Sequence, residues 1–244
     1  MTESGPAWHE VQRQVQREVQ LGGQAKVRRG RQAEAARNDQ RVLDAARAVV
    51  ATYGADAPVS AIAERAGVGM GSLYRRYGSK DELLRHLCTL AMQSTIGSAE
   101  AALADPDPWA GLSAHIAECV AQGTGTLGAL AGTIDTTPEM WAISKRSRAL
   151  LERMVTRARR AGSLRPDATA LDVAWLIEAL GKSGPAEPGS EDEAIRRRLT
   201  AIAIDGLRAP GLGRLPGRPP TARHYERRWQ HAATSAASAV SAKP

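Results

Sequence analysis

Residues 58–80 read PVSAIAERAGVGMGSLYRRYGSK, and they contain two short helical patterns joined at a glycine. The first pattern, residues 59–66, follows Pro58, which suits a first helical turn because proline lacks the N–H that would have no partner there. Gly67 then provides the backbone freedom that a sharp turn needs. The second pattern covers residues 69–77. The stretch therefore predicts two helices that meet at a tight turn.

The second of these helices is expected to bury one face and to present the other to a partner. Leu73 and Tyr77 lie four residues apart and form the buried face. The outer surface carries Met70, Gly71, Ser72, Tyr74, Arg75 and Arg76. A short helix of this kind fits the major groove of DNA, because small residues allow close approach and Ser72 and Arg75 can reach base edges or phosphates.

The order of residues in this stretch resembles the helix-turn-helix of the TetR family of bacterial transcription factors. The family pattern begins with IA-x-x-AGV, continues with a small-residue turn and ends with x-LY-x-x-(aromatic)-x-x-K. It corresponds here to Ile62, Ala63, Ala66, Gly67, Val68, Leu73, Tyr74, Tyr77 and Lys80. Two positions depart from that pattern, since Tyr77 stands where Phe is usual and Pro58 where Ser or Thr is common. Both are compatible with the fold. The resemblance is specific over about residues 37–90 and extends only to the fold beyond them.

The resemblance implies a set of DNA contacts. Tyr74 matches the family's phosphate-contacting tyrosine, and Lys80 matches its lysine at the start of the next helix. The candidate DNA-binding residues are Arg37, Arg41, Ser60, Gly69, Met70, Gly71, Ser72, Tyr74, Arg75, Tyr77 and Lys80. Two interpretations stay open for Arg37 and Arg41: contact with phosphate, or the plain solvation of most exposed arginines.

The composition is that of a DNA-binding protein with a neutral body. The chain has 244 residues and a net charge of +7, and the basic excess lies in residues 1–104 and 208–244, while residues 105–207 are slightly acidic. Two cysteines are too few for a disulfide framework, so a reducing cytoplasm is expected. No apolar run is long enough to span a membrane, and no signal-like stretch begins the chain.

The patterning predicts an all-α fold in four segments. Residues 1–36 are expected to be a flexible basic extension. Residues 37–82 are expected to form a three-helix domain and residues 83–208 a helical body. The resemblance implies that the first is a DNA-binding domain and the second a ligand-binding and dimerisation domain. Residues 209–244 are rich in Pro, Gly, Arg, Ala and Ser without an apolar period, which predicts a disordered basic tail.

The first helix of the DNA-binding domain is expected to begin at a cap, Asn38 or Asp39, and to end at Tyr53 before Gly54. Ahead of it, Lys26, Arg28, Arg29 and Arg31 are either a flexible arm that enters the minor groove or a solvated basic tail.

The resemblance also implies roles for helices of the body. The long helix from Lys80 towards Ala104 corresponds to the one that connects the family's two domains and transmits ligand state. Two helices, at about residues 167–182 and 190–207, correspond to the pair that forms the family's dimer interface, so a homodimer is expected.

Candidate ligand-binding residues lie on helices that line the pocket in the family: Trp109, His115, Met140, Trp141 and Trp175. Each of them taken alone is more often part of the core than of a ligand wall. Polar groups for a ligand are available from His115, Thr133 or Ser144. The sequence does not identify the ligand, an unknown small-molecule effector.

No motif for catalysis, for a metal or for a cofactor is present. The histidines lack metalloenzyme spacing, and no phosphate-binding loop occurs. Cys88 and Cys119 are interpreted as two buried thiols, with a redox disulfide between packed helices as the alternative.

These observations predict a non-enzymatic transcriptional regulator. The resemblance implies a cytoplasmic homodimer that represses transcription by occupying a palindromic operator in double-stranded DNA and is released by the effector. The alternative is an architectural DNA-binding protein that uses its basic arm and tail and has no effector.

Overall fold

The computed structural model describes residues 34–209 and 213–230. The chain divides into a first unit, Met1–Arg41, and a second unit, Val42–Pro244. In the first unit residues 34–41 are helical, and Arg41 donates a hydrogen bond to Asn38 Oδ1 at 3.2 Å. The predicted cap at Asn38 or Asp39 is therefore wrong, because alanines just before them favour the helix and it begins earlier. The basic residues 26–31, expected in a flexible extension, lie outside the described residues.

The second unit begins with the head, which consists of the helical residues 42–53, η1 (Gly54–Asp56), α2 (Val59–Ala66) and α3 (Met70–Tyr77). Gly67 joins α2 to α3 in a left-handed conformation, with a φ of 66°. Its N–H donates to Glu64 O at 3.1 Å, which ends α2. The two helices and the glycine turn predicted from residues 58–80 are confirmed.

The long helix α4 (Lys80–Ala104) belongs to two hydrophobic cores. Its N-cap is Ser79, whose Oγ accepts a hydrogen bond from the Glu82 N–H at 3.1 Å. The head core contains residues of the head together with Leu83, Leu84 and Leu87 of α4, and also Leu127, Leu130, Ile134 and Met140. The body core contains the later α4 residues Ile96, Ala99 and Ala102. A single rigid element therefore takes part in the packing of both.

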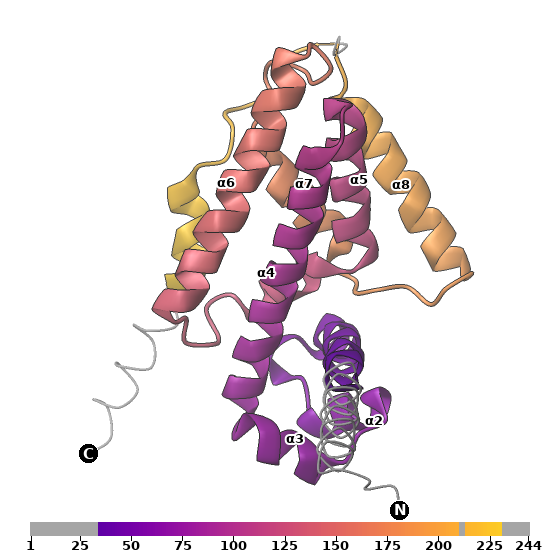
Figure 1. Ribbon diagram of the computed structural model, residues 1–244, viewed down its shortest axis with the longest axis vertical. Helices are drawn as coiled ribbons and strands as arrows, with labels where there is room; N and C mark the ends of the chain where they lie inside the picture. The colour runs from indigo at the N-terminus through magenta and orange to yellow at the C-terminus, as the bar shows by residue number, and fades with distance from the viewer. Residues whose placement is uncertain (1–33, 210–212, 231–244) are drawn as a thin grey trace, which may run out of the picture. The chain divides into compact units, whose positions relative to one another are not determined.

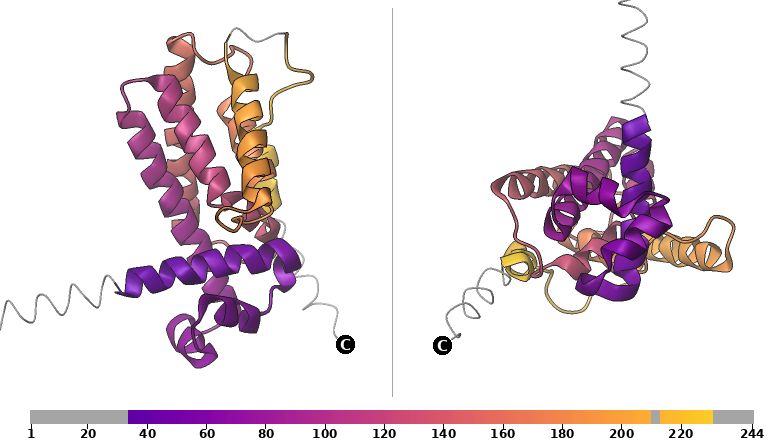
Figure 2. Two further views of the ribbon diagram at one scale, coloured as in Figure 1. Left: turned by 90° about the vertical axis from the view of Figure 1, so that its right-hand side faces the viewer. Right: turned by 90° about the horizontal axis from the view of Figure 1, so that it is seen from below.

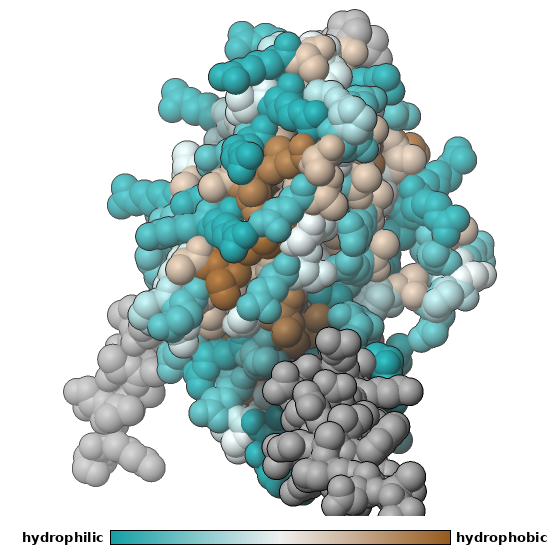
Figure 3. All heavy atoms as spheres, viewed as in Figure 1, coloured by the Kyte–Doolittle hydropathy of each residue, from teal (hydrophilic) through white to brown (hydrophobic). Residues whose placement is uncertain are grey.

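The body consists of α5 (Pro108–Ala121), η2 (Thr124–Leu130), α6 (Pro138–Arg160), α7 (Ala170–Gly181) and α8 (Glu191–Leu207). Each of its α-helices begins after a residue whose side chain accepts a backbone N–H: Asp107, Thr137, Thr169 and Ser190. Helix α4 lies against α5 and α6, and α5 also contacts α7 and α8 (Figures 1 and 2). Where α4 and α6 meet, apolar side chains reach the surface between polar ones (Figure 3). The described residues contain no strand, which confirms the all-α fold class.

Residues 213–230 correct the prediction of a disordered tail over 209–244. Residues 222–230 are helical, and the ion pairs Arg148–Glu226 and Arg228–Glu178 attach them to α6 and α7 at 2.9 Å and 2.7 Å. The average composition of the tail hides the few charged and aromatic side chains that make these contacts. Residues 210–212 and 231–244 lie outside the described residues.

One charged side chain of the head, Arg47, is buried to 1% exposure. Its Nη1 pairs with Asp44 at 3.4 Å, while its Nε and Nη2 have no hydrogen-bond partner among the described residues. Burial lowers the pKa of Arg47 below its ordinary value, because the charged form is desolvated. No feature of the sequence indicates this arrangement, since arginine is almost never fully buried unless it is paired.

We expect Arg47→Met to raise the free energy of unfolding by about 1–2 kcal/mol, because an apolar side chain of similar length removes the desolvation penalty of a poorly paired charge. Urea denaturation measures the change. Arg153→Met, at an exposed position of α6, is the control and should have an effect near zero. A destabilised Arg47→Met chain would show that the guanidinium packs and pairs better than its geometry indicates.

Candidate nucleic-acid interface and ligand pocket

The outer surface of α3 carries exposed side chains. Met70 and Tyr74 are 37% and 45% exposed, whereas Leu73 is 3% exposed. A Cβ added at Gly69 or Gly71 would meet no atom within 4 Å. The start of α3 therefore presents bare backbone and small side chains, as a helix must that enters the major groove closely.

The side chains of Arg75 and Ser72 on α3 are held by a weak contact. Arg75 Nη2 donates to Ser72 Oγ at 3.4 Å, a long hydrogen bond between two exposed groups. The Arg76 guanidinium lies 5.6 Å from the centre of the Tyr77 ring. Arg75 can exchange its one weak contact for a base edge or a phosphate at little cost.

Two predicted DNA-contacting residues have roles within the head. Tyr77 is 7% exposed, and its ring lies 5.1 Å from that of His86. Its place one turn after Leu73 puts it on the buried face, so the structure does not present its ring for DNA contact. Lys80 is half-buried, and its Nζ donates to Ala55 O at 3.0 Å. This bond ties the start of α4 to η1.

The other predicted DNA-contacting residues are exposed. Ser60 lies in the first turn of α2, and Arg37 and Arg41 lie in the first unit of the chain. The structure brings Ser72, Tyr74 and Arg75 together on α3, where their exposed side chains share one short helix.

A cavity of about 210 Å³ lies in the second unit, and side chains of α4, α5, η2, α6 and α7 line it together with residues 225 and 229. Three of the five predicted ligand residues line it: His115, Met140 and Trp141. The sequence missed other lining residues: Thr95, Arg148, Glu178, Tyr225 and Trp229. Ser144, an expected source of a polar group, also lines the cavity, and Thr133 does not.

Trp109 and Trp175 are not among the residues that line this cavity, and their role as ligand contacts stays a prediction. Trp109 stands at the start of α5, is 9% exposed in the body core, and has the Arg208 guanidinium 5.4 Å from its ring. Trp175 turns to the C-terminal helical segment, with His224 and Tyr225 ring centres at 5.7 Å and 6.2 Å. Helical periodicity places a side chain on a face, but it does not say which part of the structure lies opposite.

His115 is a buried neutral imidazole in the wall of the cavity. It is 2% exposed, and burial lowers its pKa to about 4, although the charge of Glu118 opposes this shift. Ser98 Oγ donates to Glu118 Oε2 at 2.6 Å and lies 3.1 Å from His115 Nδ1. Because the Ser98 proton is engaged with Glu118, Nδ1 carries the imidazole proton and Nε2 is the acceptor.

Both cysteines line the cavity as free, buried thiols. Burial raises the pKa of Cys88 and of Cys119 to about 12. The Cys119 sulfur lies 3.8 Å from the ring nitrogens of His115. The interpretation as two buried thiols is confirmed over the alternative of a disulfide.

Within residues 34–209 and 213–230, no group of His, Cys, Asp and Glu side chains is placed to hold a metal ion. No helix in that part of the chain is both long and apolar enough to cross a membrane.

The fold and the exposed α3 define a DNA-binding regulator of the helix-turn-helix class. The family model "Bacterial regulatory proteins, tetR family" matches residues 42–87, which cover the head and the start of α4. A second model, "Transcriptional regulator SbtR-like, C-terminal domain", matches residues 107–209, which cover α5 to α8. The chain belongs to the TetR family, and it is a non-enzymatic, DNA-binding transcriptional regulator.

Solved structures of the family share this fold. A TetR transcription regulatory protein from Mycobacterium vanbaalenii is 27% identical, with a TM-score of 0.51 over 73% of this chain and 99% of that chain. The regulator SCO0520 from Streptomyces coelicolor is 23% identical, with a TM-score of 0.50 over 71% and 99% of the two chains. The ketosteroid transcriptional regulator KstR2 of Mycobacterium tuberculosis is 19% identical, with a TM-score of 0.50 over 70% and 94%. No curated protein matches the sequence.

Proposed function

We propose that the protein is a homodimeric repressor of a palindromic operator and that a small molecule in the body cavity releases it from DNA. The observation that carries this proposal is the double role of α4. Its first turns pack in the head core beside α3, and four of its residues, Cys88, Ala91, Met92 and Thr95, line the cavity. A ligand that moves α4 therefore acts on the element that supports the DNA-contacting helix.

The energetic requirement for release is a preference of the ligand for the arrangement that cannot bind DNA. A ligand with equal affinity for both arrangements does not shift the equilibrium between them. Nearly complete release needs a preference of about 10⁴-fold for the arrangement that cannot bind DNA. By linkage, operator DNA weakens the ligand by the same factor. Calorimetric titration of a releasing ligand, with and without operator, measures this factor directly.

An apolar stripe on α8 supports a homodimer. Ile195, Leu199 and Ile202 follow the spacing of one helix face, and they are 49%, 49% and 58% exposed. Large aliphatic side chains in such a row are typical of a surface that a partner covers. A second copy of the chain, with α7 and α8 of each copy in the interface, would cover them.

We expect Leu199→Glu or Ile202→Glu to convert the dimer into a monomer, because an unpaired carboxylate would be buried in the interface. Sedimentation equilibrium measures the mass. The isolated fold should survive, since both side chains already face solvent. Ala149→Glu, at an exposed position of α6, is the matched control and should leave the dimer intact. Identical masses for the wild type, the stripe variants and the control would show that α8 is not part of the interface.

Selection of binding sites from random DNA tests the DNA-binding part of the proposal. We expect an inverted repeat whose half-sites are about one helical turn apart, roughly 34–36 Å, because the two recognition helices of a dimer follow a two-fold axis. Selected sites without inverted symmetry, or diffuse coverage of any sequence, would instead favour an architectural DNA-binding protein.

We expect Arg75→Ala to relax the base preference at one position of each half-site, by about 1–3 kcal/mol if its guanidinium binds a guanine edge. Tyr74→Phe should instead weaken binding to all sequences alike, because a phosphate contact carries no sequence information. Competition between the selected site and its single-base variants separates the two effects. Equal losses on specific and random DNA for Arg75→Ala would assign Arg75 to phosphate.

A further inference from the structure

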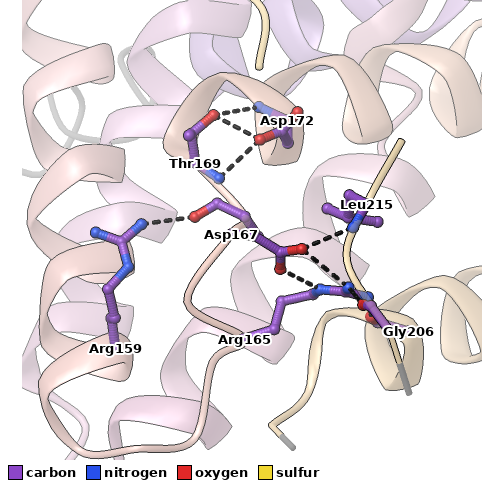
Figure 4. A network of polar contacts seen from close by, with 9 residues as sticks. Arg159, Arg165, Asp167, Thr169, Asp172, Gly206 and Leu215 are labelled. Carbon is purple, nitrogen blue, oxygen red and sulfur yellow. Dashed lines mark hydrogen bonds and ion pairs between the residues drawn. The ribbon is translucent and has the colours of Figure 1, made fainter. Parts of the chain in front are cut away.

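Residues 213–230 lie beyond the part of the chain that the family models match, which ends at residue 209. They nevertheless have a defined path along the body. At its start, the Leu215 N–H donates to Asp167 Oδ2 at 2.7 Å, and Arg165 donates to the carbonyls of Gly206 and Gly213 (Figure 4). Asp167 also pairs with Arg165 Nε at 2.6 Å. This network fixes the segment where it leaves the end of α8.

The helical residues 222–230, called the C-terminal helix below, close one side of the cavity. Tyr225 and Trp229 of this helix line it. The C-terminal helix also contacts α7, where the Arg228 guanidinium lies 4.6 Å from the Trp175 ring. The backbone carbonyl of Arg228 would lie 3.1 Å from a Cβ added at Gly132, so the helix also packs closely on the loop before α6.

The C-terminal helix pairs with both charged side chains of the cavity wall that come from α6 and α7. Arg228 binds Glu178 through two bonds, Nη1 to Oε2 at 3.0 Å and Nη2 to Oε1 at 2.7 Å. Arg148 donates to Glu226 Oε1 at 2.9 Å. Two-point contact between a guanidinium and a carboxylate is a strong and directional pairing. With the helix in place, neither charge is left for a ligand.

What remains of the wall is neutral and rich in aromatic rings and sulfur. The chain has five tryptophans and four tyrosines, and three of these residues line the cavity: Trp141, Tyr225 and Trp229. Met92 and Met140 add thioether sulfur, which makes favourable contacts with aromatic rings. The volume of about 210 Å³ is below the roughly 300–1,000 Å³ of pockets for drug-sized ligands.

We propose that the C-terminal helix is a wall of the effector site and sets its ligand class: a small, uncharged aromatic molecule with a hydroxyl or amide group. The aromatic and sulfur-containing wall binds the ring, and the hydroxyls and the neutral imidazole of His115 bind the polar group. A charged ligand is rejected, because Glu178 and Arg148 already have partners and the ligand charge would lose its water without gaining an ion pair. This inference rests on the proposed function of the cavity as an effector site.

Calorimetric titration of the full chain without DNA, with matched small probes, tests the proposal. Benzamide and benzyl alcohol are neutral, while benzoate and benzylamine have nearly the same shape and carry one charge. We expect the neutral member of each pair to bind the wild type about tenfold or more tightly than the charged one. Trp229→Ala should weaken both neutral probes, because it removes part of the wall.

Two charge variants make the test specific. Glu226→Gln leaves Arg148 without its partner and should raise the affinity for benzoate relative to benzamide by about tenfold. Arg228→Gln frees Glu178 and should do the same for benzylamine relative to benzyl alcohol. Arg227→Gln, at an exposed position of the same helix, is the control and should keep the wild-type preference. Thermal melting without probe confirms that each variant is folded. If only one of the two charge variants folds, that variant alone is sufficient for the test.

The proposal is overturned if no neutral probe binds the wild type, if the charged probes bind more tightly, or if both charge variants keep the preference of Arg227→Gln. The readout contains no DNA. If the probes bind as expected and the operator is not released by them, the proposed repressor mechanism fails while the assignment of the wall stands.

Discussion

Gly123→Ala should lower the free energy of unfolding by about 2–5 kcal/mol, an effect with two separate causes. Gly123 connects α5 to η2 with a φ of 63°, a left-handed conformation that costs a residue with a Cβ about 1–2 kcal/mol. An added Cβ would also lie 2.6 Å from the Gly184 carbonyl carbon and 2.7 Å from the Pro185 nitrogen. Overpacking against backbone costs typically about 1–3 kcal/mol more, because backbone atoms cannot move aside easily.

The matched control is Gly162→Ala, which separates the two causes. Gly162 follows α6 with a φ of 70°, and an added Cβ there would meet no atom within 4 Å. It should therefore show only the conformational cost of about 1–2 kcal/mol. Urea denaturation of both variants measures the difference. If they are equally destabilised, the chain after α7 does not pack on Gly123 as closely as the structure shows.

Acid should destabilise the wild type more than the His115→Asn variant. The pKa of His115 in the folded chain is about 4, against about 6.5 for an unperturbed histidine. Between these values the unfolded chain binds a proton that the folded chain does not, so stability falls as the pH falls. The contribution is complete above about pH 6.5 and has been lost by about pH 4, a change on the order of 3 kcal/mol.

The free energy of unfolding, measured from pH 7.5 to pH 4 for both chains, checks this prediction. His115→Asn keeps a side chain able to donate to Ser98 but cannot titrate in this range. The difference between the two curves should therefore decrease towards acid pH, although other groups shape each curve alone. Parallel curves would show that His115 is solvated or partnered in its charged form.

The head could be predicted from the sequence because its signals are local. Pro58 begins α2, Gly67 ends it, and Leu73 and Tyr77 repeat at the spacing of one helix face. These features act within a few residues of their position, so a single sequence is enough to place them. Helices α4 and α8 have equally local start signals, because the side chains of Ser79 and Ser190 cap their first turns.

The cavity could be predicted only in part, because its wall combines side chains that are far apart in the sequence. His115, Met140 and Trp141 were found through their helices. Trp109 lies outside the cavity wall because the start of α5 packs in the body core. Tyr225 and Trp229 were missed because they stand in a stretch whose composition indicates disorder, and Arg47 was missed because nothing in its neighbourhood in the sequence indicates complete burial.

The chemical reactivity of the two buried thiols, Cys88 and Cys119, can be used to measure how often the helices around them separate. Because burial raises the pKa of both thiols to about 12, they are ionised far more rarely at pH 7 than an exposed cysteine. Alkylation by iodoacetamide therefore requires that the helices around Cys88 and Cys119 open first. The labelling rate reports how often they separate, and any molecule that fills the space between them should slow it.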